Sequence, residues 1–161
     1  MGASRGVQCV REDIDRHYPK LSEAGYEITS EATPPYNCIA WAAGDSTRWW
    51  ECSEDGPIEE PGVYWPEGAR YGFGLDALIS AYERMGYELD PDGGPELDEG
   101  YDKVALYAEN GEWRHAAKLL KNGRWSSKLG DLEDVSHDSP EDVCGPFNGE
   151  LACFMRMAIR S

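Results

Sequence analysis

Apolar side chains recur at helical spacing in two stretches of the chain. In the first, steps of three and four residues predict an amphipathic helix that ends near Pro19. Its apolar positions are Val7, Val10, Ile14, Tyr18 and Leu21. The second stretch covers residues 75–85, where the same spacing predicts a helix that Gly86 ends.

Strand-like patterns dominate the second half of the chain. Residues 103–108, 113–120 and 124–129 are separated by Asn110-Gly111 and Asn122-Gly123, which are strong hairpin signals and predict an antiparallel meander. Residues 26–29 and 150–159 predict two further strands, and Ser139-Pro140 predicts a helix start. Residues 130–137 are acidic and irregular, which predicts a loop.

A long segment, residues 45–73, has few periodic positions but many aromatic side chains: Trp49, Trp50, Tyr64, Trp65 and Tyr71. A loop of this length in a compact domain is often functional. We expect the aromatic side chains of this segment to pack over the region around Cys38. The alternative is a structural Ω-loop that its tryptophans fix to the core.

The length of 161 residues predicts a single domain spanning residues 1–161, with residues 1–6 as a flexible tail. A formal net charge of −16 argues against binding to nucleic acid or to a membrane surface, because both are anionic. The acids are either a solvated surface or a surface that attracts a basic partner.

Five cysteines are an odd number without a tight pairing pattern, which favours a reduced, cytoplasmic chain. No apolar run approaches membrane-spanning length, and the first residues lack a hydrophobic signal core. We therefore expect a cytoplasmic protein, and the oligomeric state stays open.

The segment from Pro34 to Gly44 predicts a short helix with a cysteine in its first turn. Two prolines prevent a helix upstream, Asn37 is a good N-cap, and Gly44 suits the C-terminal end. Unpaired N–H groups at a helix start favour a thiolate, so Cys38 is a candidate nucleophile. The alternative is that Cys38 is a small core residue.

Among three histidines, His115 is placed like a catalyst, because it lies in the middle strand of the predicted meander. An imidazole within hydrogen-bond reach of Cys38 accepts the thiol proton and returns it to the leaving group. Alone, His115 is an ordinary strand residue. A zinc site is a weaker hypothesis, since no short Cys-Cys or Cys-His spacing occurs, and we expect no metal or cofactor.

The segments Asn-Cys-Ile-Ala-Trp-Ala (37–42), Tyr-Trp-Pro (64–66), His-Ala-Ala (115–117) and Ser-Lys-Leu-Gly (127–130) resemble motifs of an uncharacterised bacterial family with a papain-like fold. The layout is most similar to the cell-wall amidase branch of papain-like cysteine hydrolases. The resemblance implies an α+β, papain-like fold, with the cysteine helix packed on an antiparallel sheet. It also implies Cys38 as nucleophile, His115 as general base, and an oxyanion site at Asn37, whose alternative role is the N-cap.

The residue that orients the imidazole depends on the Asn122-Gly123 hairpin. A two-residue loop places Lys128 on the face of His115, whereas a three-residue loop with a bulge places Ser127 there. Ser127 also has the spacing from His115 that resembles the polar third residue of the cell-wall branch. Asp131 or Asp134 is the alternative, of which Asp134 is preferred.

Together these features predict a cysteine-dependent amide hydrolase, a peptidase, amidase or deamidase that forms an acyl-thioester intermediate on a peptide or protein substrate. Trp41, Trp50 and Trp65 are the candidate lining of its substrate cleft. The rival hypothesis is a catalytically inactive, acidic protein-interaction module of the same fold.

Overall fold

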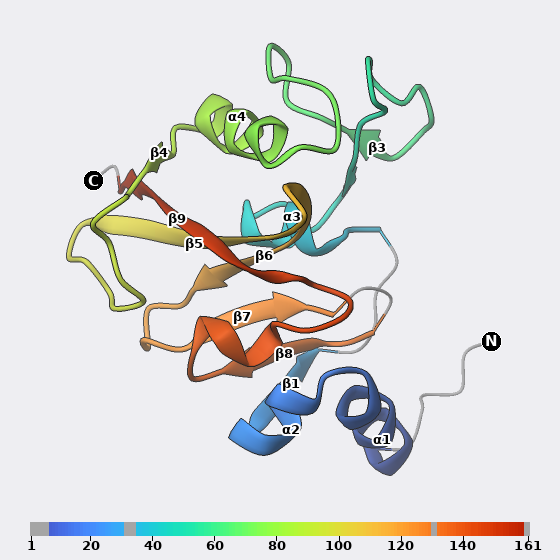
Figure 1. Cartoon of the computed structure of the whole chain (residues 1–161), viewed down its shortest axis with the longest axis vertical. Helices are drawn as coiled ribbons and strands as arrows, with labels where there is room; N and C mark the ends of the chain where they lie inside the picture. The colour runs from blue at the N-terminus through green and yellow to red at the C-terminus, as the bar shows by residue number, and fades with distance from the viewer. Residues whose placement is uncertain (1–6, 31–34, 130–131, 160–161) are drawn as a thin grey trace.

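The computed structural model describes residues 7–30, 35–129 and 132–159 (Figure 1). The expected flexible tail, residues 1–6, lies outside the described residues. The helices are α1 (Val7–His17), α2 (Pro19–Ala24), α3 (Cys38–Ala42), α4 (Leu75–Met85) and the 3₁₀ helix η1 (Pro140–Val143). The strands are β1 (Tyr26–Ser30), β2 (Trp49–Trp50), β3 (Val63–Tyr64), β4 (Glu88–Leu89), β5 (Tyr101–Glu109), β6 (Glu112–Leu119), β7 (Trp125–Lys128), β8 (Asp134–His137) and β9 (Glu150–Ala158).

Seven strands form one open sheet in the order β1-β8-β7-β6-β5-β9-β4, and every neighbouring pair is antiparallel. Strands β2 and β3 form a separate parallel pair. The expected papain-like fold is therefore wrong. The described chain is mostly an open antiparallel sheet, and its four α-helices are short, of 5 to 11 residues.

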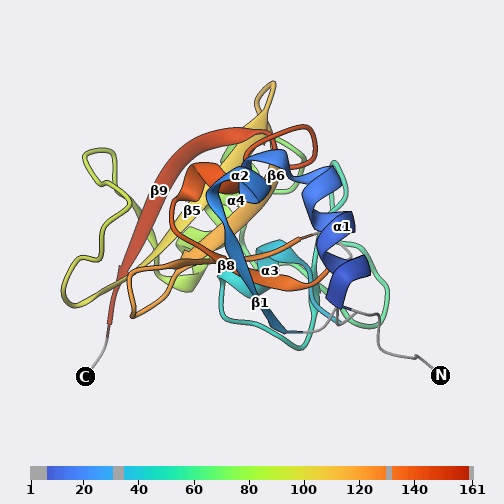
Figure 2. The ribbon, with the colours of Figure 1, turned by 90° about the horizontal axis from the view of Figure 1, so that it is seen from below.

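The sheet separates two hydrophobic cores (Figures 1 and 2). On one face, which we call the α3–α4 face, Ile39, Leu78 and Tyr82 pack on Leu106 and Ala116. On the opposite face, which we call the α1–α2 face, the members of the core are Val10, Ile14, Tyr18, Leu21, Ala105, Tyr107, Ala117, Trp125, Leu129, Val135, Val143 and Cys144. Successive residues of a strand alternate between these two cores.

The helices follow the signals in the sequence, with one difference. Helix α4 has the predicted bounds, and Gly86 ends it with φ of 110°, a left-handed conformation that glycine adopts without strain. The N-terminal helix ends at His17, and Pro19 begins the separate helix α2, because a proline without an N–H is tolerated in a first turn. Pro140 begins η1 in the same way.

The meander forms as expected, but its two turns differ. Asn110 and Gly111 both have positive φ, at 53° and 81°, and join β5 to β6 by a tight turn. Between β6 and β7, the Leu120 N–H donates to the Arg124 carbonyl at 2.8 Å, so the loop has three residues. This is the register that the three-residue loop predicts, in which Ser127 lies on the face of His115. In it, Lys118 lies opposite Ser126.

Two strands of the sheet were missed. Strand β8 falls in the segment expected to be irregular, and β4 follows α4 directly. Strand β8 has the sequence Asp-Val-Ser-His and is buried at all four positions, so it lacks the alternation of apolar and polar residues that marks a half-buried strand. Pairing with β1 and β7 on its two sides holds it in the sheet. Among the described residues, no helix has the length and apolarity to cross a membrane.

Candidate functional site

Cys38 is the first residue of α3, and Asn37 determines how that helix begins. The Asn37 Oδ1 accepts hydrogen bonds from the backbone N–H of Ala40 at 3.0 Å and of Trp50 at 3.2 Å. Its Nδ2 donates to the Trp50 carbonyl at 2.7 Å. Asn37 is therefore an N-cap that also connects α3 to β2, and one of the two N–H groups of its amide is bonded to the Trp50 carbonyl.

The Cys38 thiol lies against the backbone of β6. Its Sγ is 4.0 Å from the Arg114 carbonyl oxygen, and the residue is half-buried beside the α3–α4 core. Burial raises the pKa of the Cys38 thiol to about 11. Backbone groups of Ala116 and Ile39 and the charge of Lys128 act in the opposite direction, but they do not compensate for the burial. The thiol is therefore protonated at neutral pH.

His115 lies on the other face of the sheet. It is opposite Tyr107 in the β5–β6 ladder, and the two ring centres are 5.1 Å apart within the α1–α2 face. Cys38 packs beside the α3–α4 core, to which the next residue of β6, Ala116, belongs. The structure therefore does not bring Cys38 and His115 together.

A bulge in β6 contributes to this arrangement. Tyr107 is opposite His115, but Ala108 is opposite Trp113, so Arg114 is an extra residue in the ladder. Trp113 and His115 would share a face in a regular strand. Because of the bulge, Trp113 packs with the α3–α4 core while His115 lies on the α1–α2 face.

His115 is the first member of a buried chain of hydrogen bonds. Its Nε2 is 3.1 Å from the Ser127 Oγ, which is 2.9 Å from the His137 Nε2. The His137 Nδ1 is 2.8 Å from the Ser139 carbonyl, so this nitrogen carries a proton and donates it. Ser127 then donates to His137, and His115 donates to Ser127. We call this group the histidine–serine chain.

The histidine–serine chain is closed to solvent and uncharged. His115, Ser127 and His137 are each completely buried. Burial lowers the pKa of His115 to about 3, with the charge of the neighbouring His137 as a second cause, and burial lowers that of His137 to about 4. Within the described residues, the Nδ1 of His115 has no hydrogen-bond partner. The chain connects β6, β7 and β8 to the start of η1.

The structure places Ser127 next to the histidine ring, as the three-residue loop requires, and places Asp134 elsewhere. Asp134 Oδ2 accepts from the Ser30 hydroxyl at 2.6 Å and from the Tyr36 hydroxyl at 2.7 Å. Its neighbour across the ladder is Lys128, whose ammonium is 5.6 Å from the Tyr36 ring centre. Asp131 lies outside the described residues.

The three tryptophans of the expected cleft have different environments. Trp50 is completely buried and donates to Asp45 at 2.8 Å, and Trp65 is 8% exposed and stacks on Trp113. Only Trp41 is half-exposed, and its Nε1 donates to Ser126 at 3.0 Å. Trp50 and Trp65 therefore fix the long loop to the core, as the Ω-loop alternative states.

The same loop presents an exposed surface, of which the sequence analysis named Tyr71 but not Phe73. Tyr71 and Phe73 are 42% and 46% exposed, and Gly72 between them donates to the Ser53 carbonyl at 3.1 Å. Five carboxylates of the same loop are also exposed: Glu51, Glu54, Asp55, Glu59 and Glu60. We call these seven side chains the acidic–aromatic rim. The five carboxylates lie within ten residues of the sequence, and the contact between residues 53 and 72 brings Gly72, which lies between the two aromatic residues, to this segment.

The fold and the site define a domain built on one open antiparallel sheet, with its candidate catalytic residues divided between the two faces. The chain belongs to the family described as a domain of unknown function (DUF7689), whose model matches residues 27–156. No curated protein matches the chain, and no solved structure matches it.

Proposed function

We propose that this domain is a protein-interaction module that binds a basic protein partner through the acidic–aromatic rim. The observation that carries the proposal is that one loop exposes five carboxylates together with Tyr71 and Phe73. Within the described part of the chain, none of the five rim carboxylates forms an ion pair. Their charge is available to a partner.

A second acidic segment of the chain supports this argument by contrast. Lys103, whose side chain is almost completely buried, lies 2.9 Å from Asp98 and 3.9 Å from Asp90. It also donates to the carbonyls of Gly94 and Glu96. The acids of this segment therefore hold their own loop in place, because a buried ammonium must be paired. The rim carboxylates form no such ion pairs within the described chain.

The aromatic members of the rim make the proposal more specific than charge alone. Exposed Tyr and Phe side chains contribute apolar contact area, and aromatic rings are enriched at protein interfaces. A cation above the face of such a ring gains a further stabilisation of about 0.5–1 kcal/mol at an exposed site. Lysine and arginine side chains combine an apolar stem with a cationic end, so they match both kinds of group in the rim.

The test uses a short fluorescent peptide rich in lysine and arginine. In the rim variant, Glu54→Gln, Asp55→Asn, Glu59→Gln and Glu60→Gln remove four charges, and we expect the affinity to fall about tenfold, since each exposed charge pair contributes about 0.2–1 kcal/mol. The matched control removes four exposed carboxylates that are spread over the chain: Glu23, Glu27, Glu99 and Glu150. Equal losses in both variants would show that net charge alone attracts the peptide, and the proposal would be wrong.

A second candidate function is the cysteine-dependent amide hydrolysis expected from the sequence. One observation favours it, namely that Cys38 is half-exposed at the start of α3. The charge of Lys128 lowers the pKa of the Cys38 thiol, but burial outweighs this effect and the pKa is raised overall. Attack by the sulfur would require a base other than His115, because that ring lies on the opposite face. The test incubates the natural chain and Cys38→Ala with a peptide amide and looks for a trapped acyl-enzyme. This candidate predicts an acyl-enzyme in the natural chain and none in Cys38→Ala.

A further inference from the structure

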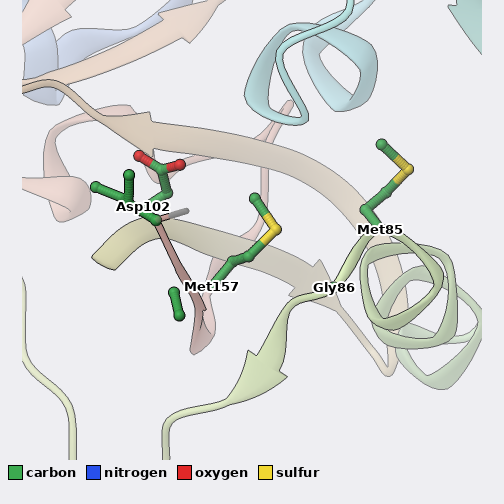
Figure 3. A pocket seen from close by; sticks show the side chains of 6 residues that line it. Met85, Gly86, Asp102 and Met157 are labelled. Carbon is green, nitrogen blue, oxygen red and sulfur yellow. The ribbon is translucent and has the colours of Figure 1, made fainter. Parts of the chain in front are cut away.

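A groove lies between the end of α4 and the strands β5 and β9, away from the acidic–aromatic rim. It has a volume of about 450 Å³ and is lined by Met85, Gly86, Asp102, Met157, Ala158 and Ile159. In Figure 3 the side chains of Asp102, Met157 and Met85 lie in a row, with Met157 between the other two. Met85 and Ile159 are 40% and 48% exposed. The groove is therefore an open apolar surface with one carboxylate at its end.

A glycine, Gly86, lines the groove beside Met157. A Cβ added at Gly86 would lie 3.0 Å from the Met157 sulfur, so a side chain at this position would shift the end of the flexible Met157 side chain by a few tenths of an ångström. Methionine side chains adapt to differently shaped ligands because they are unbranched and polarizable. The walls of the groove consequently fit a flexible, apolar stem.

The carboxylate of Asp102 is available to a ligand. Asp102 is exposed and, in the described chain, forms neither an ion pair nor a side-chain hydrogen bond. Burial lowers the pKa of the nearby Lys118 and the charge of Asp102 acts to raise it, but no ion pair joins these two described residues, and the Lys118 ammonium lies 3.8 Å from the centre of the Trp41 ring. An unpaired carboxylate beside an apolar wall is complementary to a group with an apolar stem and a positive end.

We propose that this groove binds a lysine or arginine side chain of the protein partner, with its stem against Met85 and Met157 and its charge at Asp102. The proposal rests on the proposed function, in that it names a second contact for the same basic partner. A purely apolar side chain, or Arg160 of the chain itself, would be a different occupant. The experiment below separates these three cases.

The probe is hexylammonium, with 1-hexanol as its neutral analogue, observed by NMR of methyl-labelled methionines. We expect hexylammonium to shift the methyl signals of Met85 and Met157 and to leave that of Met155, which is completely buried, unchanged. Hexanol should bind about three- to fivefold more weakly, because it lacks the exposed charge pair. In Asp102→Asn the two probes should bind equally, whereas Asp55→Asn should keep the preference.

Each contrary result has a distinct meaning. Equal binding of hexanol and hexylammonium to the natural chain would show an apolar occupant, and the proposal would be overturned. Binding only after residues 160–161 are removed would show that Arg160 fills the groove, which also overturns it. The loss of peptide affinity in the rim variant does not depend on any of these outcomes, so the proposed function and the groove can fail separately.

Discussion

The two faces of the sheet hold their polar groups in opposite ways. On the α1–α2 face, His115, Ser127 and His137 are buried and bond to one another in a fixed order of donors and acceptors. On the α3–α4 face, Cys38 and Trp41 are half-exposed and lie at the border of the core. The first group stabilises the fold, and the second is open to other molecules. A cysteine and a histidine in the right order along a chain therefore do not define a site until the face of each is known.

The largest expected effect comes from breaking the histidine–serine chain. His115→Ala leaves a cavity and removes the donor to Ser127, so we expect a loss of about 2–4 kcal/mol in the free energy of unfolding. Urea denaturation measures it, and His17→Ala, in α1, is the control, with an expected loss below about 1 kcal/mol. If His115→Ala also lost less than about 1 kcal/mol, the buried histidine–serine chain would not stabilise the fold, and the contrast drawn between the two faces would be wrong.

Acid should lower the free energy of unfolding through the two histidines of the same face. The pKa values of His115 and His137 are about 3 and about 4 in the folded chain, below the ordinary value of 6.5, so the unfolded chain binds more protons as the pH falls. Stability is therefore lost below pH 6.5, by about 2 kcal/mol for each histidine at about pH 5. Urea denaturation at a series of pH values measures this slope.

The controls for the acid effect are single variants. His17→Gln should keep the full slope between about pH 6.5 and 5, a range above the ordinary pKa values of carboxylates. His137→Gln should lose about half of the slope. A stability that stays constant over this range in the natural chain would contradict the neutral, buried state of the two histidines.

The smallest effect on stability is expected on the α3–α4 face. Cys38→Ala removes one sulfur atom from a half-buried position, so we expect a change of at most about 1–2 kcal/mol in the free energy of unfolding. Binding of the basic peptide should not change, because Cys38 is not part of the acidic–aromatic rim. A loss as large as that of His115→Ala would instead make Cys38 a core residue.

Local signals in the sequence predicted most of the elements. The spacing of Leu75, Leu78 and Tyr82 and the following Gly86 determined α4, and Asn37 determined the start of α3. These signals depend on residues within a few positions of each other, which is why they could be recognised in one sequence. Strand β8 could not be recognised, because it is defined by its pairing with β1 and β7.

The candidate site could be predicted only in part, for the same reason. The proximity of Ser127 to His115 followed from the length of one hairpin loop, a local feature. The separation of Cys38 from His115 depends on the bulge at Arg114 and on which face α3 covers, and both are set by contacts between distant segments. The resemblance to papain-like hydrolases placed these residues in one site, whereas the sheet order divides them.

The pH dependence of Cys38 alkylation tests the central claim most directly, namely that Cys38 has no imidazole partner. Iodoacetamide labelling is followed by peptide mapping from about pH 6 to 11, a range that spans the ordinary pKa of a thiol. Burial raises the pKa of Cys38 to about 11, so we expect slow labelling at neutral pH, a steady rise toward high pH, and the same profile in His115→Gln. Rapid labelling near pH 6 that disappears in His115→Gln would show a Cys38–His115 ion pair and contradict the account.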